Sequence, residues 1–186
     1  MTIIIPNKNE PNIEIMANAV RKLFPEAQLI LSDDLEGVGK GWAIREGLKR
    51  ADSLPVIFID GDLDIKPLEI SRVLAFSPRY FGFDVVVGKK EMPQNWKRRL
   101  ITRLSRRYIR FMFGLKVDTQ TGLKLFNYKP DFKTNGWACD IEMLYKAKKM
   151  GKKIHEVPIH ATVSDSKTLK DLWTTFVDSL KIRFSL

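Results

Sequence analysis

Short apolar segments alternate with segments of helical periodicity over the first 90 residues, and this alternation constrains the fold more than any other feature. Each apolar segment is short and apolar on both faces, as in strands that are covered on both sides. Because strands that alternate with helices form parallel sheets, we expect an α/β fold with a mostly parallel central sheet flanked by helices. The expected strands span residues 2–6, 27–34, 54–60 and 83–90, and the expected helices span 12–24, 37–51 and 67–75.

The second half of the chain has a different character. Residues 96–113 predict a long basic helix, 116–128 a strand or loop, 136–151 a helix and 152–162 a strand. No repeat or low-complexity linker interrupts the sequence. We therefore expect one domain at 1–167, followed by an amphipathic C-terminal helix at 168–186.

Three aspartates, Asp60, Asp62 and Asp64, follow the third expected strand. Ligands of parallel sheets bind beyond the carboxyl ends of the strands, where this chain places several polar clusters. Clustered carboxylates are costly unless a cation neutralises them, and Mg²⁺ and Mn²⁺ prefer carboxylate oxygen. The pattern predicts a magnesium or manganese site at these aspartates, and the alternative is a solvated loop that caps the next helix.

The formal net charge of the chain is +10, which indicates an anionic partner: nucleic acid, a phosphorylated small molecule or an anionic membrane. A single cysteine, Cys139, excludes an internal disulfide and is expected to be a buried core thiol. No apolar run approaches the roughly 20 residues of a membrane span, and the N-terminus does not resemble a signal peptide. We expect a cytoplasmic protein.

The segment "GVGKGWAIREG" is glycine-rich but is neither a Walker motif nor a dinucleotide fingerprint. Its glycines have the wrong spacing for a Walker motif, and Trp42 stands where a dinucleotide fingerprint has its last glycine. Alone it predicts a flexible turn at the start of a helix, where backbone amides and Lys40 could bind an anion.

Seven motifs in order give the chain a resemblance to family 2 glycosyltransferases of the GT-A fold, most like the polyprenyl-phosphate sugar synthases such as the dolichol-phosphate mannose synthases. The resemblance covers about residues 2–167. The motifs are "IIIPNKNE", "GKGWAIREGLKRA", "VIFIDGDLDIKPLEI", "DVVVGKK", "DTQTGLKLF", "CDIEMLYKAKKMG" and "IHEVPI". It implies a catalytic domain that binds a nucleoside diphosphate sugar and a divalent metal.

The same resemblance implies roles for individual residues. Asp60 and Asp62 would be the DxD pair that holds the metal and the diphosphate, and the metal would neutralise the leaving group. Lys90 stands where the family has a phosphate-binding arginine, and it keeps the charge without the bidentate fork. Asp64 departs from the family pattern and has no assigned role. Further nucleotide-binding candidates are Pro6, Asn9, Glu10, Lys40, and Asp33 or Asp34, the last two facing the base or ribose.

Two acids of "CDIE", Asp140 and Glu142, are candidate catalytic residues, and the resemblance implies that one of them faces the sugar or acceptor. A hydroxyl acceptor would need a general base, whereas a phosphate acceptor is already ionised. The alternative is an acid pair that interacts with a helix dipole. His160 is a weaker candidate for a metal ligand.

The helix at 97–110 carries seven basic residues and no acid, interleaved with apolar residues. This composition suits nucleic acid, an anionic membrane surface, or a packed helix with a basic outer face. The resemblance favours the membrane, with Arg99 and also Arg103 as candidates for the phosphate of a lipid acceptor. The C-terminal helix would pack on the domain, on a second copy in a homodimer, or on the membrane.

We therefore predict an inverting, metal-dependent glycosyltransferase at the cytosolic face of a membrane, which moves a sugar from a nucleotide sugar to a polyprenyl phosphate such as dolichyl phosphate. The rival functions are a glycosyltransferase with a non-lipid acceptor, a nucleotidyltransferase, and a nucleic-acid-binding module. The last leaves the acids at the strand ends unexplained, so no nucleic-acid partner is expected.

Overall fold

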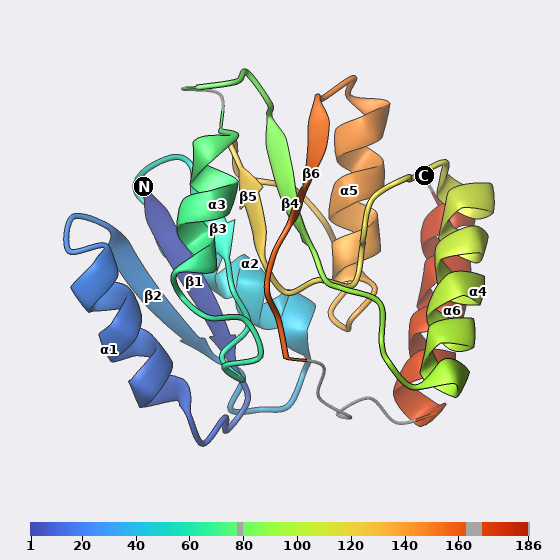
Figure 1. Ribbon diagram of the computed structural model, residues 1–186, viewed down its shortest axis with the longest axis horizontal. Helices are drawn as coiled ribbons and strands as arrows, with labels where there is room; N and C mark the ends of the chain where they lie inside the picture. The colour runs from blue at the N-terminus through green and yellow to red at the C-terminus, as the bar shows by residue number, and fades with distance from the viewer. Residues whose placement is uncertain (78–79, 163–168, 186) are drawn as a thin grey trace.

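The computed structural model describes residues 1–77, 80–162 and 169–185, and within them a six-stranded sheet in the order β2-β1-β3-β5-β4-β6 (Figure 1). Strand β1 runs parallel to β2 and β3, and β4 runs parallel to β6. Only β5, among the described strands, is antiparallel to its neighbours. The prediction of a mostly parallel sheet is confirmed. The strands are β1 Thr2–Asn7, β2 Gln28–Asp33, β3 Val56–Phe58, β4 Val85–Lys89, β5 Lys124–Phe126 and β6 Ile154–Pro158.

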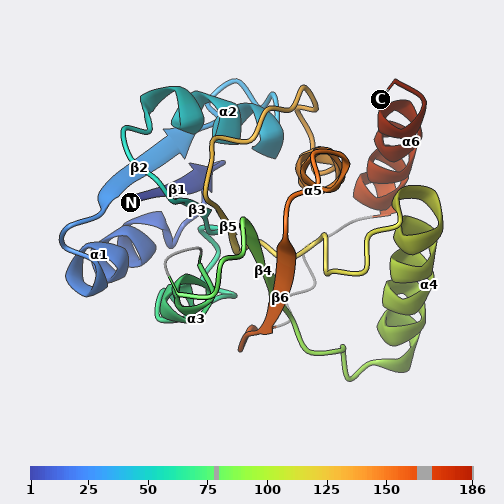
Figure 2. The same cartoon turned by 90° about the horizontal axis from the view of Figure 1, so that it is seen from above.

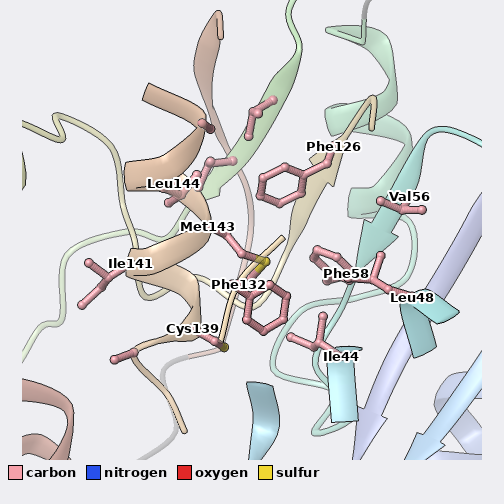
Figure 3. Packing of buried hydrophobic residues seen from close by; sticks show 14 of the residues in the cluster. Ile44, Leu48, Val56, Phe58, Phe126, Phe132, Cys139, Ile141, Met143 and Leu144 are labelled. Carbon is pink, nitrogen blue, oxygen red and sulfur yellow. The ribbon is translucent and has the colours of Figure 1, made fainter. Parts of the chain in front are cut away.

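Helices cover both faces of the sheet, because alternate residues of each strand point to opposite faces. In β1, Ile4 packs with α2 and α5, whereas Ile3 and Ile5 pack with α1 and α3. Figure 2 shows the sheet between these two layers, and Figure 3 shows the aromatic core under α2 and α5, where Phe58 and Phe126 meet. These helices are α1 Ile13–Leu23, α2 Lys40–Arg50, α3 Glu69–Ala75 and α5 Cys139–Lys149.

Helix α4, Trp96–Phe113, and helix α6, Leu169–Ser185, lie side by side beyond α5 (Figures 1 and 2). The Tyr108 hydroxyl lies 2.9 Å from the Ser179 hydroxyl oxygen, and the Tyr108 ring lies against that of Phe176. Ile182 is buried in the same core cluster as the strands. Of the three placements considered for the C-terminal helix, the structure therefore shows packing on the domain.

The bounds of α4 match the predicted helix at 96–113, and local capping explains them. The Asn95 side chain accepts hydrogen bonds from the backbone amides of Lys97 and Arg98, as an N-cap does. Gly114 adopts a left-handed conformation with φ of 62° at the other end. In the part of the chain that the structure describes, no helix is long and apolar enough to cross a bilayer.

Candidate active site

The parallel strands end at one edge of the sheet, the lower edge in Figure 1, and polar residues follow them there. Strands β1, β3, β4 and β6 end there, and β5 begins there because it runs in the opposite direction. Asp60 comes shortly after β3, and Lys90 directly follows β4. The first turns of α2 and α5 bring Lys40 and Asp140 to the same place. The predicted gathering of site residues at this edge is therefore present.

Lys40 joins two of the predicted acids. Its Nζ lies 2.8 Å from Asp60 Oδ1 and 3.2 Å from Asp140 Oδ2, and its side chain is buried. Burial would lower the pKa of Lys40, but the charges of Asp140 and Asp60 raise it above its usual value. Burial would likewise raise the pKa of Asp60, but Lys40 lowers it. Both groups therefore stay charged at neutral pH.

Two glycines allow this close approach. A Cβ on Gly41 would lie 2.1 Å from the backbone oxygen of Thr134, so only glycine lets α2 begin against the segment that leads into α5. A Cβ on Gly122 would lie 2.0 Å from Asp60 Oδ2. The glycine before β5 thus makes room for the first aspartate of the DxD pair.

The backbone amides at the start of α2 do not form a phosphate cradle. The amides of Gly41 and Trp42 donate to the carbonyl oxygen of Asn135, at 2.6 and 3.2 Å. The hypothesis that backbone amides in this turn bind an anion is wrong for these two groups, because a protein carbonyl occupies them. Lys40 remains a candidate through its side chain.

Asp33 and Asp34 differ in their burial and in the groups that they contact. Asp34 is buried and accepts hydrogen bonds from the amides of Val38 and Gly39, at 2.7 and 2.8 Å, so it holds the turn before α2. Asp33 is exposed and accepts a hydrogen bond from the Asn7 side chain at 2.6 Å. Of the two acids, Asp33 is the one that a nucleotide can reach.

The second DxD aspartate lies among other carboxylates. Asp62 Oδ1 accepts a hydrogen bond from the Asp64 amide at 3.0 Å, and Leu63 between them has a φ of +61°, which a bulky side chain rarely adopts. Burial and then the charge of Asp60 raise the pKa of Asp62. Burial and then these three aspartates raise the pKa of Glu10. A bound cation would relieve this repulsion.

Within residues 1–77, 80–162 and 169–185, no three His, Cys, Asp or Glu side chains form a group that could hold a metal. Asp60 and Asp62 therefore do not build a closed protein cage. Mg²⁺ commonly binds through one or two carboxylates and completes its shell with water and substrate phosphates. The pair fits such a cation, and Asp62 is the more available member because Asp60 is bonded to Lys40.

The remaining nucleotide candidates lie near this edge with different exposure. Pro6 is buried within β1 opposite Ser32, and exposed Asn9 has a φ of +56° in the turn after β1. Lys90 Nζ lies 3.9 Å from Asp64 Oδ2. Lys90 thus faces the DxD segment, whereas Pro6 shapes the strand end.

Glu142 is engaged by its surroundings. Its carboxylate accepts hydrogen bonds from the amides of Lys133 and Thr134 and from the Thr134 hydroxyl, and it pairs with Lys146 at 3.0 Å. Burial would raise the pKa of Glu142, but these hydrogen bonds lower it. A carboxylate bonded in this way is a poor base, which favours a structural role.

Helix α4 presents a mixed basic and apolar face. Arg99 is exposed, as are Leu100 and Leu104 at 50% and 58% of their maximal area. Arg106 differs, because it pairs with the buried residue Asp118 at 2.7 Å. The helix is therefore anchored by one arginine and presents others outward.

Three weaker signals are resolved by packing. Cys139 is buried and free, as expected of a core thiol. His155 stacks on Phe83 with 4.3 Å between ring centroids, which suits a structural histidine. His160 is exposed and lies 4.0 Å from exposed Glu91, and it is not part of a described metal group.

Sequence reasoning missed Lys124, the first residue of β5. Its side chain is 1% exposed, and its Nζ lies 2.8 Å from Asp140 Oδ1. The available signal was a lysine within the apolar segment "GLKLF", where a charge needs a buried partner. The partner lies on a distant helix, so the segment alone could not identify it.

No family model matches the chain. It is 27% identical over 165 residues to an uncharacterized protein of Methanocaldococcus jannaschii, covering 80% of this chain and 66% of that protein. It is 26% identical over 159 residues to a dolichyl-phosphate beta-glucosyltransferase of Drosophila melanogaster, covering 75% of this chain and 48% of that protein. It is 24% identical over 202 residues to an undecaprenyl-phosphate mannosyltransferase of Micrococcus luteus, covering 84% and 81%.

The chain spans about half to two thirds of the length of the first two of these relatives. Among solved structures, it is similar to glucosyl-3-phosphoglycerate synthase of Mycobacterium tuberculosis, with a TM-score of 0.77 and 18% identity over 99% of this chain and 79% of that one. The complex of that synthase with Mn²⁺ and UDP-glucose matches with a TM-score of 0.75 and 17% identity, over 98% and 78%. The chain has the GT-A fold, and its resemblance to family 2 glycosyltransferases is confirmed.

Proposed function

We propose that this protein transfers a sugar from a nucleoside diphosphate sugar to a phosphorylated acceptor, with a divalent metal at the DxD pair. The observation that carries the proposal is the meeting of Asp60, Asp62, Lys40 and Lys90 at the carboxyl edge of a GT-A sheet. Carboxylates beside lysines suit a metal and diphosphate together, because the lysines take the phosphate charge that the metal does not.

The residues then have distinct tasks in the proposed reaction. Asp62 holds the metal, which would be Mg²⁺ or Mn²⁺ and would supply charge neutralisation to the leaving diphosphate. Asp60 holds Lys40 in place, and Lys90 approaches the phosphates from β4. Attack by the acceptor phosphate on the anomeric carbon, opposite the leaving diphosphate, would invert that centre without a protein base.

A polyprenyl phosphate is the acceptor that we propose, and helix α4 supports it. Its exposed face combines arginines with Trp96, Leu100, Ile101 and Leu104, a composition that suits an anionic membrane interface. Helix α4 begins on the same side of the molecule as the candidate active site (Figure 1). Two sequence relatives are named for dolichyl and undecaprenyl phosphate. Arg99 would bind the acceptor phosphate at the cytosolic membrane surface.

The donor site is tested by thermal unfolding with MnCl₂ and UDP, GDP or another nucleoside diphosphate. We expect a rise in melting temperature of several degrees that requires metal and nucleotide together, and its loss in Asp62→Ala. Lys152→Met, which breaks an ion pair with Asp84 outside the site, is the matched control and should keep the shift. If no nucleoside diphosphate shifts the wild-type protein with metal, the proposal fails.

The acceptor is tested by incubating nucleotide sugars with a short polyprenyl phosphate or with 3-phosphoglycerate. We expect a glycosylated polyprenyl phosphate, formed more slowly by Arg99→Met. Product from 3-phosphoglycerate alone would instead assign a non-lipid acceptor, as the name of the structural neighbour would suggest. Sedimentation with anionic vesicles should weaken with salt, and stronger binding to RNA or DNA would favour the nucleic-acid alternative.

A further inference from the structure

A buried lysine at the start of β5, a strand with neighbours on both sides, needs an explanation. Lys124 is 1% exposed, and burying its ammonium is costly unless the charge is paired. Its Nζ donates to the carbonyl oxygen of Thr121 and lies 2.8 Å from Asp140 Oδ1. A methionine would fill this position without the cost of burying a charge. The charged side chain therefore indicates a function that involves the groups it contacts.

Those contacts lead to the DxD pair. Asp140 uses Oδ1 for Lys124 and Oδ2 for Lys40, and Lys40 continues to Asp60 Oδ1. The four groups alternate in sign and sum to zero formal charge, and they join β5, α5, α2 and the segment after β3. Asp140 has both oxygens on ammonium groups and is buried, so it is poorly placed to remove a proton from an acceptor.

We propose that Lys124 and Asp140 are positioning residues that hold Lys40 as the cation for the donor diphosphate. This inference rests on the proposed function, and it gives Asp140 a task other than the base that a hydroxyl acceptor would need from Asp140 or Glu142. Lys124 limits Asp140 to one oxygen for Lys40. Without Lys124, both oxygens of Asp140 can take Lys40 and draw it away from Asp60 and the diphosphate.

The test compares binding of Mn²⁺ alone with binding of UDP or GDP in saturating Mn²⁺, by electron paramagnetic resonance and calorimetry. We expect Lys40→Met and Lys124→Met each to weaken nucleotide binding by about tenfold. Lys124→Met should not weaken the binding of Mn²⁺ alone, because Asp62 holds the metal and Asp60 is released from Lys40. The double variant should be no weaker than Lys40→Met, since Lys124 acts through Lys40.

The matched control is Lys146→Met, which breaks the ion pair with Glu142 on the same helix and should leave nucleotide affinity unchanged. A purely structural Lys124 would lower the melting temperature without changing the affinity of folded protein, and that result would overturn the inference. So would additive losses in the double variant. A wild-type protein that binds neither nucleotide removes the proposed function and this inference with it.

Lys124→Met leaves one excess buried negative charge, and the variant can fail to fold. The charge-balanced variant Lys124→Met with Asp140→Asn removes one charge of each sign from the network. We expect it to fold and to lose nucleotide affinity by about tenfold, because Lys40 loses its anchor. Retained affinity in this variant would contradict the positioning role.

Discussion

The two aspartates of the Asp-Gly-Asp segment are not equivalent, although they lie two residues apart. Asp60 is held by Lys40, and the attraction keeps its pKa below its usual value. Asp62 faces like charges, and burial and Asp60 raise its pKa. One aspartate therefore stabilises the metal-free fold, and the other opposes it.

Replacing each aspartate by asparagine should shift stability in opposite directions. Asp60→Asn leaves Lys40 undercompensated and should lower the free energy of unfolding by about 2 kcal/mol. Asp62→Asn keeps the acceptor for the Asp64 amide but removes repulsion, and it should raise the free energy of unfolding by less than about 1 kcal/mol, because partial exposure screens the repulsion. Urea denaturation in EDTA at pH 7 measures both, and a loss of stability in Asp62→Asn would refute the electrostatic argument.

The same variants should differ in their pH dependence. A carboxyl whose pKa is raised by folding binds more protons in the native state, so stability is lost as pH rises through the folded pKa of Asp62. The benefit of Asp62→Asn should therefore grow between pH 4 and pH 7. The pKa of Asp60 is lowered from 3.8, so its contribution is lost only at more acidic pH. The cost of Asp60→Asn should be constant above about pH 5.

The sequence identified which acids gather at this edge but not what each one contacts. Asp60, Asp62 and Lys90 were predictable because they follow apolar strands. The role of Asp34 was not predictable, because it depends on the backbone geometry of a turn. Glu142 similarly bonds amides of an irregular segment that has no periodic pattern.

At the scale of the element, helix α4 divides its arginines between two tasks. Arg106 pairs with Asp118, a buried residue that also accepts a hydrogen bond from the Gln120 amide. Arg107, the next residue, is exposed. A uniform run of basic residues in the sequence thus contains both an anchor, Arg106, and surface charges such as Arg107.

This division predicts different results for neighbouring substitutions. Arg106→Met should lower the free energy of unfolding by about 1–2 kcal/mol, because Asp118 loses its partner, and should weaken vesicle binding little. Arg107→Met should leave stability within about 0.5 kcal/mol and weaken binding to anionic vesicles. Chemical denaturation and vesicle sedimentation check the pair. Equal effects of both variants on both measurements would contradict the assignment.

The elements themselves were largely predictable, whereas their pairing was not. Periodicity and capping residues locate helices such as 96–113 to within a residue or two. The order of strands, and the reversal of β5, depend on contacts between distant segments that a single sequence does not reveal. The close approach of α2 to the segment before α5 was not predictable either, because a glycine in the sequence is compatible with both a flexible turn and close packing.

At the scale of the whole molecule, the C-terminal helix belongs to the core rather than to an appendage. Ile182 of α6 is 5% exposed and lies in one cluster with Val85 of β4 and Phe126 of β5. We therefore propose that α6 unfolds together with the sheet instead of forming a separate unit. Contacts between α4 and α6 hold α4 in place and so fix the orientation of its exposed face.

Ile182→Ala should lower the free energy of unfolding by about 2–4 kcal/mol in one transition, because it removes buried methyl groups. Phe184→Ala, on the same helix and 84% exposed, is the matched control and should change it by less than about 0.5 kcal/mol. Circular dichroism and tryptophan fluorescence should report the same midpoint in both variants. Two separate transitions would show that α6 is independent of the sheet.

The reversal of strand β5 has a consequence for how this protein could be altered. Loops after β1, β3 and β4 supply Asn9, Asp62 and Lys90, and loops tolerate changes in length and sequence. Lys124 reaches the same edge from within a strand whose neighbours lie on both sides. The candidate site thus has an exchangeable part and a fixed part. Under the proposed function, randomising the other positions of the three loops, while keeping Asp62, Lys90 and β5, would be a rational route to new donor preferences, since the fixed charge would stay in register.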